Sequence, residues 1–466
     1  MVASEATPLV KSGGLADVVG SLPAALRELG HDVAVVLPRY ASISLDGATR
    51  VWDGIAVHLG LGTFICGIWE KQVNGTRVFF VDCPPLFHRP GLYDHPDNHV
   101  RFAAFCQGAL ATLRFLFNAD VIHLHDWQAA LCAAYLRTRY ALDPLFARVK
   151  IVYTIHNLDY QGRFSAGQFT ELALDRWLME PRFLEYYGDV NFMKAGIVFA
   201  DAVTTVSPRY AEEIQTPEFG SGLDGMLRAH ASKLHGLLNG CDYGEWDPRN
   251  DTHIVRRFDA ESLEGKRDCK LDLLFALGLE EANVERPLLG MVTRFAPQKG
   301  MDLFMEIAGD LMESDDVCVA VVGAGEPVYE EFFRGFASAY PGRVAGFIGY
   351  NNPLAHKIEA GADIFLMPSR FEPCGLNQMY SLRYGTVPVV RATGGLDDTV
   401  DPETGFKFTG YKARDFLAAI QLALTDFRDK PQAWRERMRL GMSRDFSWKA
   451  SAESYSELYR QLRLLI

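Results

Sequence analysis

The chain has 466 residues, of which 48% are hydrophobic and 23% are charged, and its formal net charge is −12 at pH 7. This composition is typical of a globular protein, and the length predicts two domains of roughly 200 residues each rather than one core. The negative charge argues against a nucleic-acid partner, because phosphate backbones require a clustered basic surface.

The chain shows no sign of a membrane or secretory segment. Apolar runs such as 317–325 have the length of a strand, far short of the roughly 20 residues that cross a bilayer. The first residues include Glu5 and show no basic segment before an apolar core, so we expect no signal peptide. The eight cysteines form no C-x-x-C pair, which predicts reduced thiols and no zinc site. We therefore expect a cytoplasmic protein with no membrane partner.

Short apolar runs that end in polar turns alternate with helix-like segments in two series along the chain. This alternation predicts βαβ units and a parallel sheet in each half. The strands expected in the first half are 33–37, 78–81, 121–124, 151–155 and 202–206, and those in the second half are 288–292, 317–322, 344–348, 364–367 and 387–390.

The two series are separated by the segment 237–243, which is followed by a loop-rich stretch at 246–251. We place a hinge there. The tail 433–466 has a helical pattern, with aromatic and leucine side chains available for packing. No repeat at a solenoid period is present.

Two glycines near the start, Gly13 and Gly14, predict a loop that feeds a helix. Glycines permit positive φ and a close approach of the backbone to a diphosphate or a sugar. Lys11 precedes them by two residues. A bare K-x-G-G, taken alone, favours an ordinary turn between a strand and a helix.

Three histidines lie at the ends of predicted strands. His123 and His125 are two residues apart, a spacing that is compatible with a metal, but no third ligand follows at a suitable distance, so we expect no metal there. His156 comes directly after the strand 151–155, where a lone histidine is more often structural than functional.

Arg294 and Lys299 follow the strand 288–292. Arginine offers a planar fork for phosphate oxygens and lysine a mobile point charge, so the pair can neutralise a departing diphosphate. At about 4 Å and an effective dielectric near 20, each contact contributes roughly 4 kcal/mol before desolvation. The alternative is a solvated basic turn, which the position at the carboxyl end of a strand disfavours.

The most informative stretch is 368–390, in which Glu372 lies on a turn between a buried strand and a helix. Ligands bind at the carboxyl ends of strands in open α/β sheets, so this turn is expected to face a ligand. The residues Gly375, Leu376 and Asn377 begin the helix, and its free N–H groups favour a phosphate.

These motifs together resemble those of the bacterial glycogen synthases and plant starch synthases. The resemblance extends over nearly the whole chain. The matching blocks are K-S-G-G-L-A-D-V-V-G-S-L-P from Lys11, H-D-W from His125, T-I-H-N-x-x-Y-Q-G from Thr154, R-x-x-x-x-K-G from Arg294, and S-R-F-E-P-C-G-L from Ser369.

The resemblance implies an α/β fold with two Rossmann-like domains facing a deep cleft, the B-type (GT-B) glycosyltransferase architecture. The implied domains are 1–238 on the acceptor side, 239–445 for the nucleotide sugar, and a helix in 446–466 that crosses back to the first domain. Ligand-driven closure about the hinge is a further expectation.

The resemblance also implies the site residues. The implied catalytic residues are Glu372, His156, Arg294 and Lys299, with His156 contacting the transferred glucose. The implied substrate-binding residues are Lys11, Gly13, Gly14, Asp17, Asp126, Trp127, Asn157, Tyr160, Gln161, Asn239, Tyr350, Cys374, Gly375, Leu376 and Asn377.

The sequence departs from the family pattern at two places. Many retaining relatives have a second glutamate eight residues after the first, whereas this position is Tyr380, as in the glycogen and starch synthase branch. The chain also begins at Met1-Val2-Ala3, where family members usually begin several residues earlier, and we expect upstream codons that complete the first strand to raise the thermal stability.

Other chemistries are disfavoured. The segment 323–328 lacks the third glycine of a dinucleotide fingerprint, and the sequence contains no D-x-D to hold a metal and diphosphate. A hydrolase needs a pair of carboxylates, and only Glu372 has a suitable setting. A phosphorylase would need a lysine that binds pyridoxal phosphate, which the sequence alone does not exclude.

The expected function is therefore a retaining, metal-independent transfer of glucose from ADP-glucose to an α-1,4-glucan, without a cofactor. The alternatives are a non-catalytic glucan-binding protein of the same fold and an enzyme that uses UDP-glucose. The sequence leaves the oligomeric state, allosteric control and the choice of glycogen or starch as product open.

Overall fold

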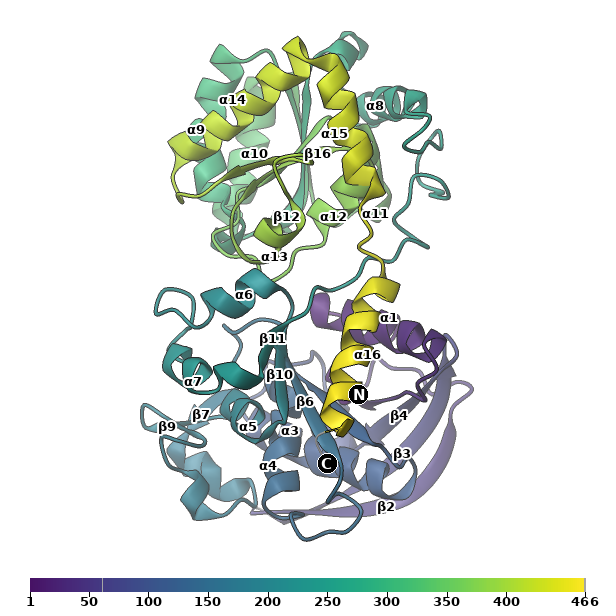
Figure 1. The fold of residues 1–466 in the computed structure, drawn as a ribbon, viewed down its shortest axis with the longest axis vertical. Helices are drawn as coiled ribbons and strands as arrows, with labels where there is room; N and C mark the ends of the chain where they lie inside the picture. The colour runs from purple at the N-terminus through teal and green to yellow at the C-terminus, as the bar shows by residue number, and fades with distance from the viewer. Residues whose placement is uncertain (61, 465–466) are drawn as a thin grey trace. The chain divides into compact units, whose positions relative to one another are not determined.

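The computed structural model describes residues 1–60 and 62–464, and these divide into two compact units (Figure 1). Unit 1 comprises Met1–Gly240 together with the segment that begins at Trp448, and unit 2 comprises Cys241–Ser447. In the described part of the chain, every helix is too short or too polar to cross a bilayer.

Unit 1 is built on two groups of strands that Val2 joins. One group has the order β1-β4-β3-β2 and the other, which is parallel throughout, has the order β11-β10-β6-β5. Val2 forms parallel bridges with Val36 in the first group and Leu124 in the second. The strands are β1 (Ala34–Pro38), β2 (Thr49–Leu59), β3 (Gly62–Val73), β4 (Thr76–Asp82), β5 (Val121–His125), β6 (Lys150–Ile155), β10 (Ala202–Thr205) and β11 (Leu234–Gly236).

A small antiparallel sheet also belongs to unit 1. Its order is β7-β9-β8, from β7 (Arg163–Ser165), β8 (Glu185–Tyr186) and β9 (Asp189–Asn191). It follows the loop after β6, so it lies next in sequence to a carboxyl-end loop of the main sheet.

Helices pack around the main sheet of unit 1. The last helix, α16, packs across α1 (Figure 1). Ser456 Oγ of α16 lies 2.8 Å from Nε2 of His31, which follows α1, and Tyr459 OH lies 2.7 Å from Nδ1 of His123 in β5. The helices are α1 (Gly14–Glu28), α2 (Pro84–Phe87), α3 (Asn98–Phe115), α4 (Asp126–Arg137), α5 (Phe192–Phe199), α6 (Pro208–Glu213), α7 (Asp224–Ala229) and α16 (Trp448–Leu464).

Unit 2 has a parallel sheet of order β14-β13-β12-β15-β16-β17. Its strands are β12 (Leu288–Phe295), β13 (Cys318–Gly325), β14 (Val344–Ile348), β15 (Ile364–Met367), β16 (Val387–Arg391) and β17 (Phe406–Phe408). Its helices are α8 (Glu264–Ala276), α9 (Met301–Ser314), α10 (Pro327–Ala339), α11 (Asn352–Gly361), α12 (Asn377–Arg383), α13 (Gly394–Thr399), α14 (Ala413–Asp429) and α15 (Pro431–Ser443).

The core of unit 2 explains why its strands are nearly continuous apolar runs. Leu289, Val319 and Ile364 belong to one buried cluster, whereas Leu288, Ala320 and Phe365 belong to another. Alternate residues of a strand point to opposite faces, so both faces of the sheet are covered and both must be apolar.

All ten predicted strands are present, and two of them, β12 and β13, run three residues further than expected. The expectation that a helix follows every strand was wrong after β1, where the antiparallel pair β2 and β3 intervenes. Most residues of β2 are exposed or half-buried, so this strand lacks the apolar run on which the prediction relied.

The predicted helical tail is two helices, α15 and α16, separated by 444–447. Both segments have a helical pattern, and neither Gly nor Pro lies between them at 444–447. Leu465 and Ile466, at the end of that prediction, lie outside the described residues.

A buried polar cluster holds the beginning of unit 2. His356 in α11 is fully buried, with Nδ1 2.8 Å from Asp251 Oδ2 and its ring stacked on Trp246 at 3.7 Å. Tyr384 donates to the same carboxylate at 2.5 Å. Burial lowers the pKa of His356, but its bonds and proximity to Asp251 and Glu245 prevail and raise the pKa to about 8.

This cluster predicts a pH-dependent stability. Because the folded pKa of His356 lies above its ordinary value, protonated His356 contributes its full stabilisation below about pH 6.5, and the contribution is lost as the pH rises through about 8. We expect H356Q to lower the free energy of unfolding by on the order of 2 kcal/mol more at pH 6 than at pH 9. Chemical denaturation of both proteins at the two pH values measures this, and equal losses at both would contradict it.

Candidate active site

The carboxylate of Glu372 is fixed at the carboxyl end of β15. Its residue is 5% exposed, and Oε2 accepts from Lys299 Nζ at 2.5 Å and from Ser369 Oγ at 3.1 Å. Lys299 follows β12, the neighbour of β15 in the sheet. The ion pair therefore ties together two neighbouring loops at the edge where α/β sheets bind ligands.

The backbone of these loops approaches closely at two glycines. Gly300 has φ 71°, and a Cβ there would lie 2.0 Å from Pro368 O. Gly394 has φ 45°, and its Cβ would lie 1.9 Å from Glu372 O. Only glycine combines the left-handed conformation with such a contact, so both glycines position the Glu372 loop.

Arg294 lies near the end of β12 with an exposed side chain. Its Nη2 is 3.4 Å from Gln298 Oε1. The side-chain amide of Gln298 also donates to Phe371 O at 3.3 Å, and its backbone carbonyl accepts from the backbone N–H of Arg370 at 2.8 Å. The described contacts thus leave the guanidinium at the surface of this edge, while Lys299 beside it is engaged with Glu372.

The segment after Glu372 is shaped by two amides. Asn377, the first residue of α12, donates to Val292 O at 2.6 Å. Gln378 Nε2 is within 3.1 Å of Cys374 O, Gly375 O and Thr399 Oγ1. Cys374 is buried, and Leu376 immediately precedes the helix. That this helix start binds a phosphate stays a prediction.

Sequence reasoning missed three groups here. Ser369 and Gln378 were not singled out, since an isolated serine or glutamine carries little signal. Gly394 and Gly395 were also missed. The T-G-G that they form begins three residues after the predicted strand 387–390 and resembles the glycine pair near the start of the chain, and this signal could have found them.

In unit 1, His156 directly follows β6 and lies beside His125. His156 Nε2 is 3.0 Å from His125 Nδ1, and the backbone N–H of His156 donates to Asp126 Oδ1 at 2.7 Å. Burial lowers the pKa of His156 to about 3 and raises that of Asp126 to about 7. Burial also holds the pKa of His125 well below its ordinary value, so both imidazoles are neutral at pH 7 and a ring N–H of one donates a hydrogen bond to the other.

The loop after His156 is held by buried amides. Gln161 Nε2 donates to Ser221 O at 3.0 Å, and Gln161 Oε1 accepts from Asn191 at 2.7 Å. Asn157 Oδ1 accepts from the backbone N–H of Asp159 at 3.0 Å. Tyr160 between them is 61% exposed. The loop is thus rigidly anchored and presents one aromatic ring outward.

The ring of Trp127, in the first turn of α4, is buried among Phe102, Phe164 and Phe192. These contacts give Trp127 a packing role in the described residues. Its contact with a substrate stays a prediction.

The glycine loop at the start of unit 1 has free space around its two glycines. Gly13 precedes α1 and Gly14 begins it, and a Cβ on either would meet no described atom within 4 Å. Lys11 Nζ pairs with Asp17 Oδ1 at 2.7 Å. Sequence reasoning did not single out buried Glu5, whose Oε1 accepts from Ser12 Oγ at 2.7 Å and so fixes this loop.

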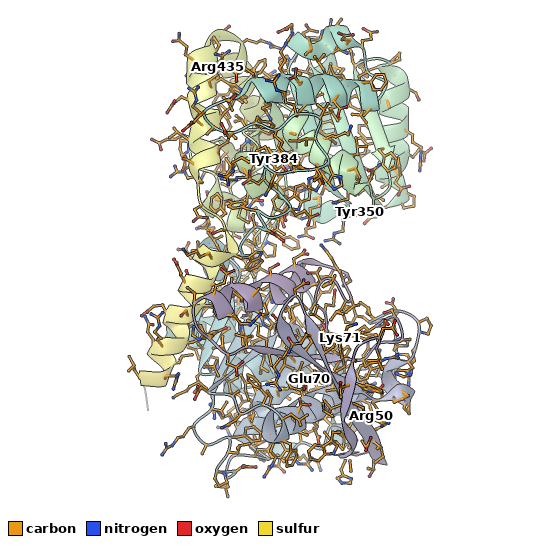
Figure 2. All side chains as sticks on the ribbon, turned by 90° about the vertical axis from the view of Figure 1, so that its right-hand side faces the viewer. Arg50, Glu70, Lys71, Tyr350, Tyr384 and Arg435 are labelled. Carbon is orange, nitrogen blue, oxygen red and sulfur yellow. The ribbon has the colours of Figure 1, made fainter. Side chains whose placement is uncertain are left out.

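Two further predicted residues lie in different settings. Asn239 is buried, and its Oδ1 finds no hydrogen-bond donor among the described residues. Tyr350 is 88% exposed and lies at the margin of unit 2, whereas Tyr384 lies in its interior (Figure 2). No cluster of three or more His, Cys, Asp or Glu side chains suited to a metal occurs within 1–60 and 62–464.

Gly300 supplies a test of the site geometry. We expect G300A to destabilise the protein and to abolish most activity, since the new methyl group would displace the Pro368 carbonyl and with it the Glu372 loop. In G309A, within α9, the Cβ meets no described atom within 4 Å, so we expect stabilisation by about 0.5–1 kcal/mol. Thermal unfolding compares the two, and a G300A protein as stable as wild type would contradict this assignment.

The parallel sheets and their carboxyl-end loops define an α/β fold of the B-type glycosyltransferases. The family model of the starch synthase catalytic domain matches residues 1–229 of the chain, and the family model of glycosyl transferases group 1 matches residues 280–440. The solved catalytic domain of starch synthase IV from Arabidopsis thaliana, bound to ADP and acarbose, has a TM-score of 0.90 at 34% identity, covering 99% of this chain and 98% of that one.

Curated relatives agree with this class. The glycogen synthase of Koribacter versatilis is 47% identical, covering 99% of this chain and 97% of the relative, and that of Bacillus cereus (strain B4264) is 44% identical, covering 98% of both. The chain belongs to the glycogen and starch synthase family. It is a hexosyltransferase that synthesises α-glucan, which confirms the predicted family, fold class and enzymatic nature and disfavours a non-catalytic binding protein.

Proposed function

We propose that the protein transfers glucose from ADP-glucose to the non-reducing end of an α-1,4-glucan with retention of configuration. The observation that carries the proposal is the Lys299–Glu372 ion pair at the ligand edge of unit 2, with Arg294 on the strand that precedes Lys299. The ADP and acarbose bound to the starch synthase IV relative support a nucleotide and a glucan-like ligand.

The charges of unit 2 suit a departing diphosphate. Arg294 is exposed and offers its fork to phosphate oxygens, while Lys299 adds a positive charge already oriented by Glu372. A preorganised cation stabilises charge that develops in the transition state without reorganisation at that moment. The same ion pair holds the carboxylate of Glu372, which would accept hydrogen bonds from glucose hydroxyls.

His156 suits the sugar side because it is neutral. A neutral imidazole donates or accepts a hydrogen bond to a sugar hydroxyl without adding a second positive charge next to an oxocarbenium-like centre. The proposed mechanism uses none of the carboxylates in the described residues as a nucleophile.

Instead, the acceptor 4-hydroxyl attacks C1 on the face that the phosphate leaves. The C1–O4 bond forms, the C1–O bond to phosphate breaks, and the hydroxyl proton passes to the departing phosphate.

The remaining predicted residues are assigned to substrate by the same proposal. The glycine loop of unit 1 would approach the donor, and the exposed rings Tyr160 and Tyr350 would contact sugar and nucleotide respectively. The further assignments are Lys11, Gly13, Gly14, Asp17, Asp126, Trp127, Asn157, Gln161, Asn239, Cys374, Gly375, Leu376 and Asn377. The proposal invokes no metal and no cofactor.

The proposal predicts release of ADP from ADP-glucose in the presence of glycogen, with slower release of UDP from UDP-glucose at equal concentration. A coupled nucleoside-diphosphate assay measures both. Preference for UDP-glucose would overturn the donor assignment, and a covalent glycosyl-enzyme trapped on Glu372 or Asp126 would overturn the same-face mechanism.

We expect R294A and K299A each to lower kcat by roughly 10²- to 10³-fold, the effect of removing one preorganised donor, with a smaller effect on the KM for glycogen. Their stabilities should differ. K299A leaves the buried Glu372 carboxylate without its cation and should lower the melting temperature, whereas R294A removes an exposed side chain and should not.

Activity of the wild type should persist in EDTA, and added magnesium should not rescue either variant. Full activity of R294A or K299A, or loss of wild-type activity in EDTA with recovery in magnesium, would refute the assignment of the diphosphate to these two side chains.

A further inference from the structure

A single aromatic residue is presented at the tip of the β8–β9 hairpin. Tyr187 and Gly188 form the two-residue loop between the paired residues Tyr186 and Asp189. Both loop residues have positive φ, 50° for Tyr187 and 90° for Gly188, as a type I′ turn requires. The side chain of Tyr187 is 82% exposed.

A tyrosine with a positive φ and an exposed ring is unfavourable for the stability of the fold. The first position of such a turn favours Asn, Asp or Gly, and a bulky residue in the left-handed region is a genuine outlier. The exposed ring also gains little from burial. Folding therefore gives no reason for a tyrosine at this position, and residues held in unfavourable backbone conformations cluster at functional sites.

The surrounding contacts hold the turn in place. The buried ammonium of Lys194 donates to Pro181 O at 2.7 Å and to Glu185 O. Glu185 Oε1 accepts from the backbone N–H of Gly188 at 2.7 Å. These hydrogen bonds hold the tip of the hairpin in place, so Tyr187 projects from a rigid turn.

Tyr187 contacts Tyr186, whose ring in turn lies against Arg163. Its ring meets that of Tyr186 edge-on at 4.8 Å, and the Arg163 guanidinium lies 4.8 Å from the centre of the Tyr186 ring. Arg163 pairs with Asp189 at 3.6 Å, and both side chains are about half exposed. A flat ring packs against the apolar C–H face of a glucose unit, while planar charged groups bind pairs of neighbouring hydroxyls.

The hairpin is also bonded to the loop that follows His156. Ser221 O accepts both from Tyr186 OH at 2.8 Å and from Gln161 Nε2 at 3.0 Å. Ser221 Oγ donates to Asp159 Oδ1 at 2.7 Å, and Asn191 of β9 donates to Gln161. The tip and the His156 loop therefore belong to one rigid network within unit 1.

We propose that Tyr187 binds the glucan chain, with one glucose ring stacked on its side chain and with Arg163 and Asp189 bonded to the hydroxyls of that unit. The inference rests on the proposed function in that it takes the substrate to be an α-1,4-glucan. The role is binding of the polymer rather than chemistry at the transferred glucose.

The test is Y187N, because asparagine suits the left-handed conformation and separates binding from folding. We expect Y187N to keep or raise the melting temperature, while the KM for glycogen rises by about three- to tenfold, the loss of one aromatic contact. The KM for ADP-glucose and kcat should stay unchanged. Y187F, which retains the ring, should bind glycogen as the wild type does.

Binding is measured without donor, by affinity electrophoresis in gels containing glycogen, so that the result is independent of turnover. The matched control is F275A, which removes another exposed aromatic, 86% exposed on α8 of unit 2, and should leave glycogen binding unchanged. An inactive wild type that still binds glycogen through Tyr187 would refute the proposed transfer alone. Unaltered glycogen binding in Y187N, or equal losses in Y187N and Y187F, would overturn the stacking role.

Discussion

The arrangement of unit 2 depends on the ion pair between Lys299 and the buried carboxylate of Glu372. A carboxylate removed from water is stable only if it is paired and hydrogen-bonded, and breaking a buried pair typically costs on the order of 3–5 kcal/mol. The pair thereby fixes the loops that follow two neighbouring strands. Gly394, which contacts the carbonyl of Glu372, holds the same loop from the next strand along the sheet. The ion pair and this glycine thus hold together the loops that follow β12, β15 and β16.

In unit 1, neutral side chains rather than an ion pair hold the carboxyl edge of the sheet. Burial keeps His123, His125 and His156 neutral, so hydrogen bonds rather than charges organise this edge. His123 bonds Thr154 and Tyr459, and His125 bonds His156. The ring of His123 lies 4.1 Å from that of His125, so Tyr459 of the last helix contacts the histidine that packs against the His125–His156 pair. Under the proposed function, the charged side chains of unit 2 would serve a diphosphate, and the neutral imidazole of unit 1 would serve a sugar hydroxyl.

Much of the candidate site follows from strand ends. Glu372, Lys299 and His156 each follow an apolar run, and within one parallel sheet the carboxyl ends of the strands lie at the same edge. Glu372 and Lys299 in unit 2, and His156 in unit 1, could therefore be singled out from the sequence. Gln378 and Ser369 could not, because their importance comes from the carbonyls and the carboxylate that they contact. Contacts of this kind arise only when segments distant in sequence are folded together.

By itself, the sequence determined the ten main strands, the α/β class and the family, because apolar runs, glycines and charged motifs are local features that the chain carries in any conformation. Only the tertiary structure decided the rest. It placed the antiparallel pair β2 and β3 after β1, since a half-exposed strand has no apolar run to mark it. It also put Tyr187 at an exposed turn in the left-handed region, because the backbone angle of one residue is set by the strands and by the Lys194 contacts around it.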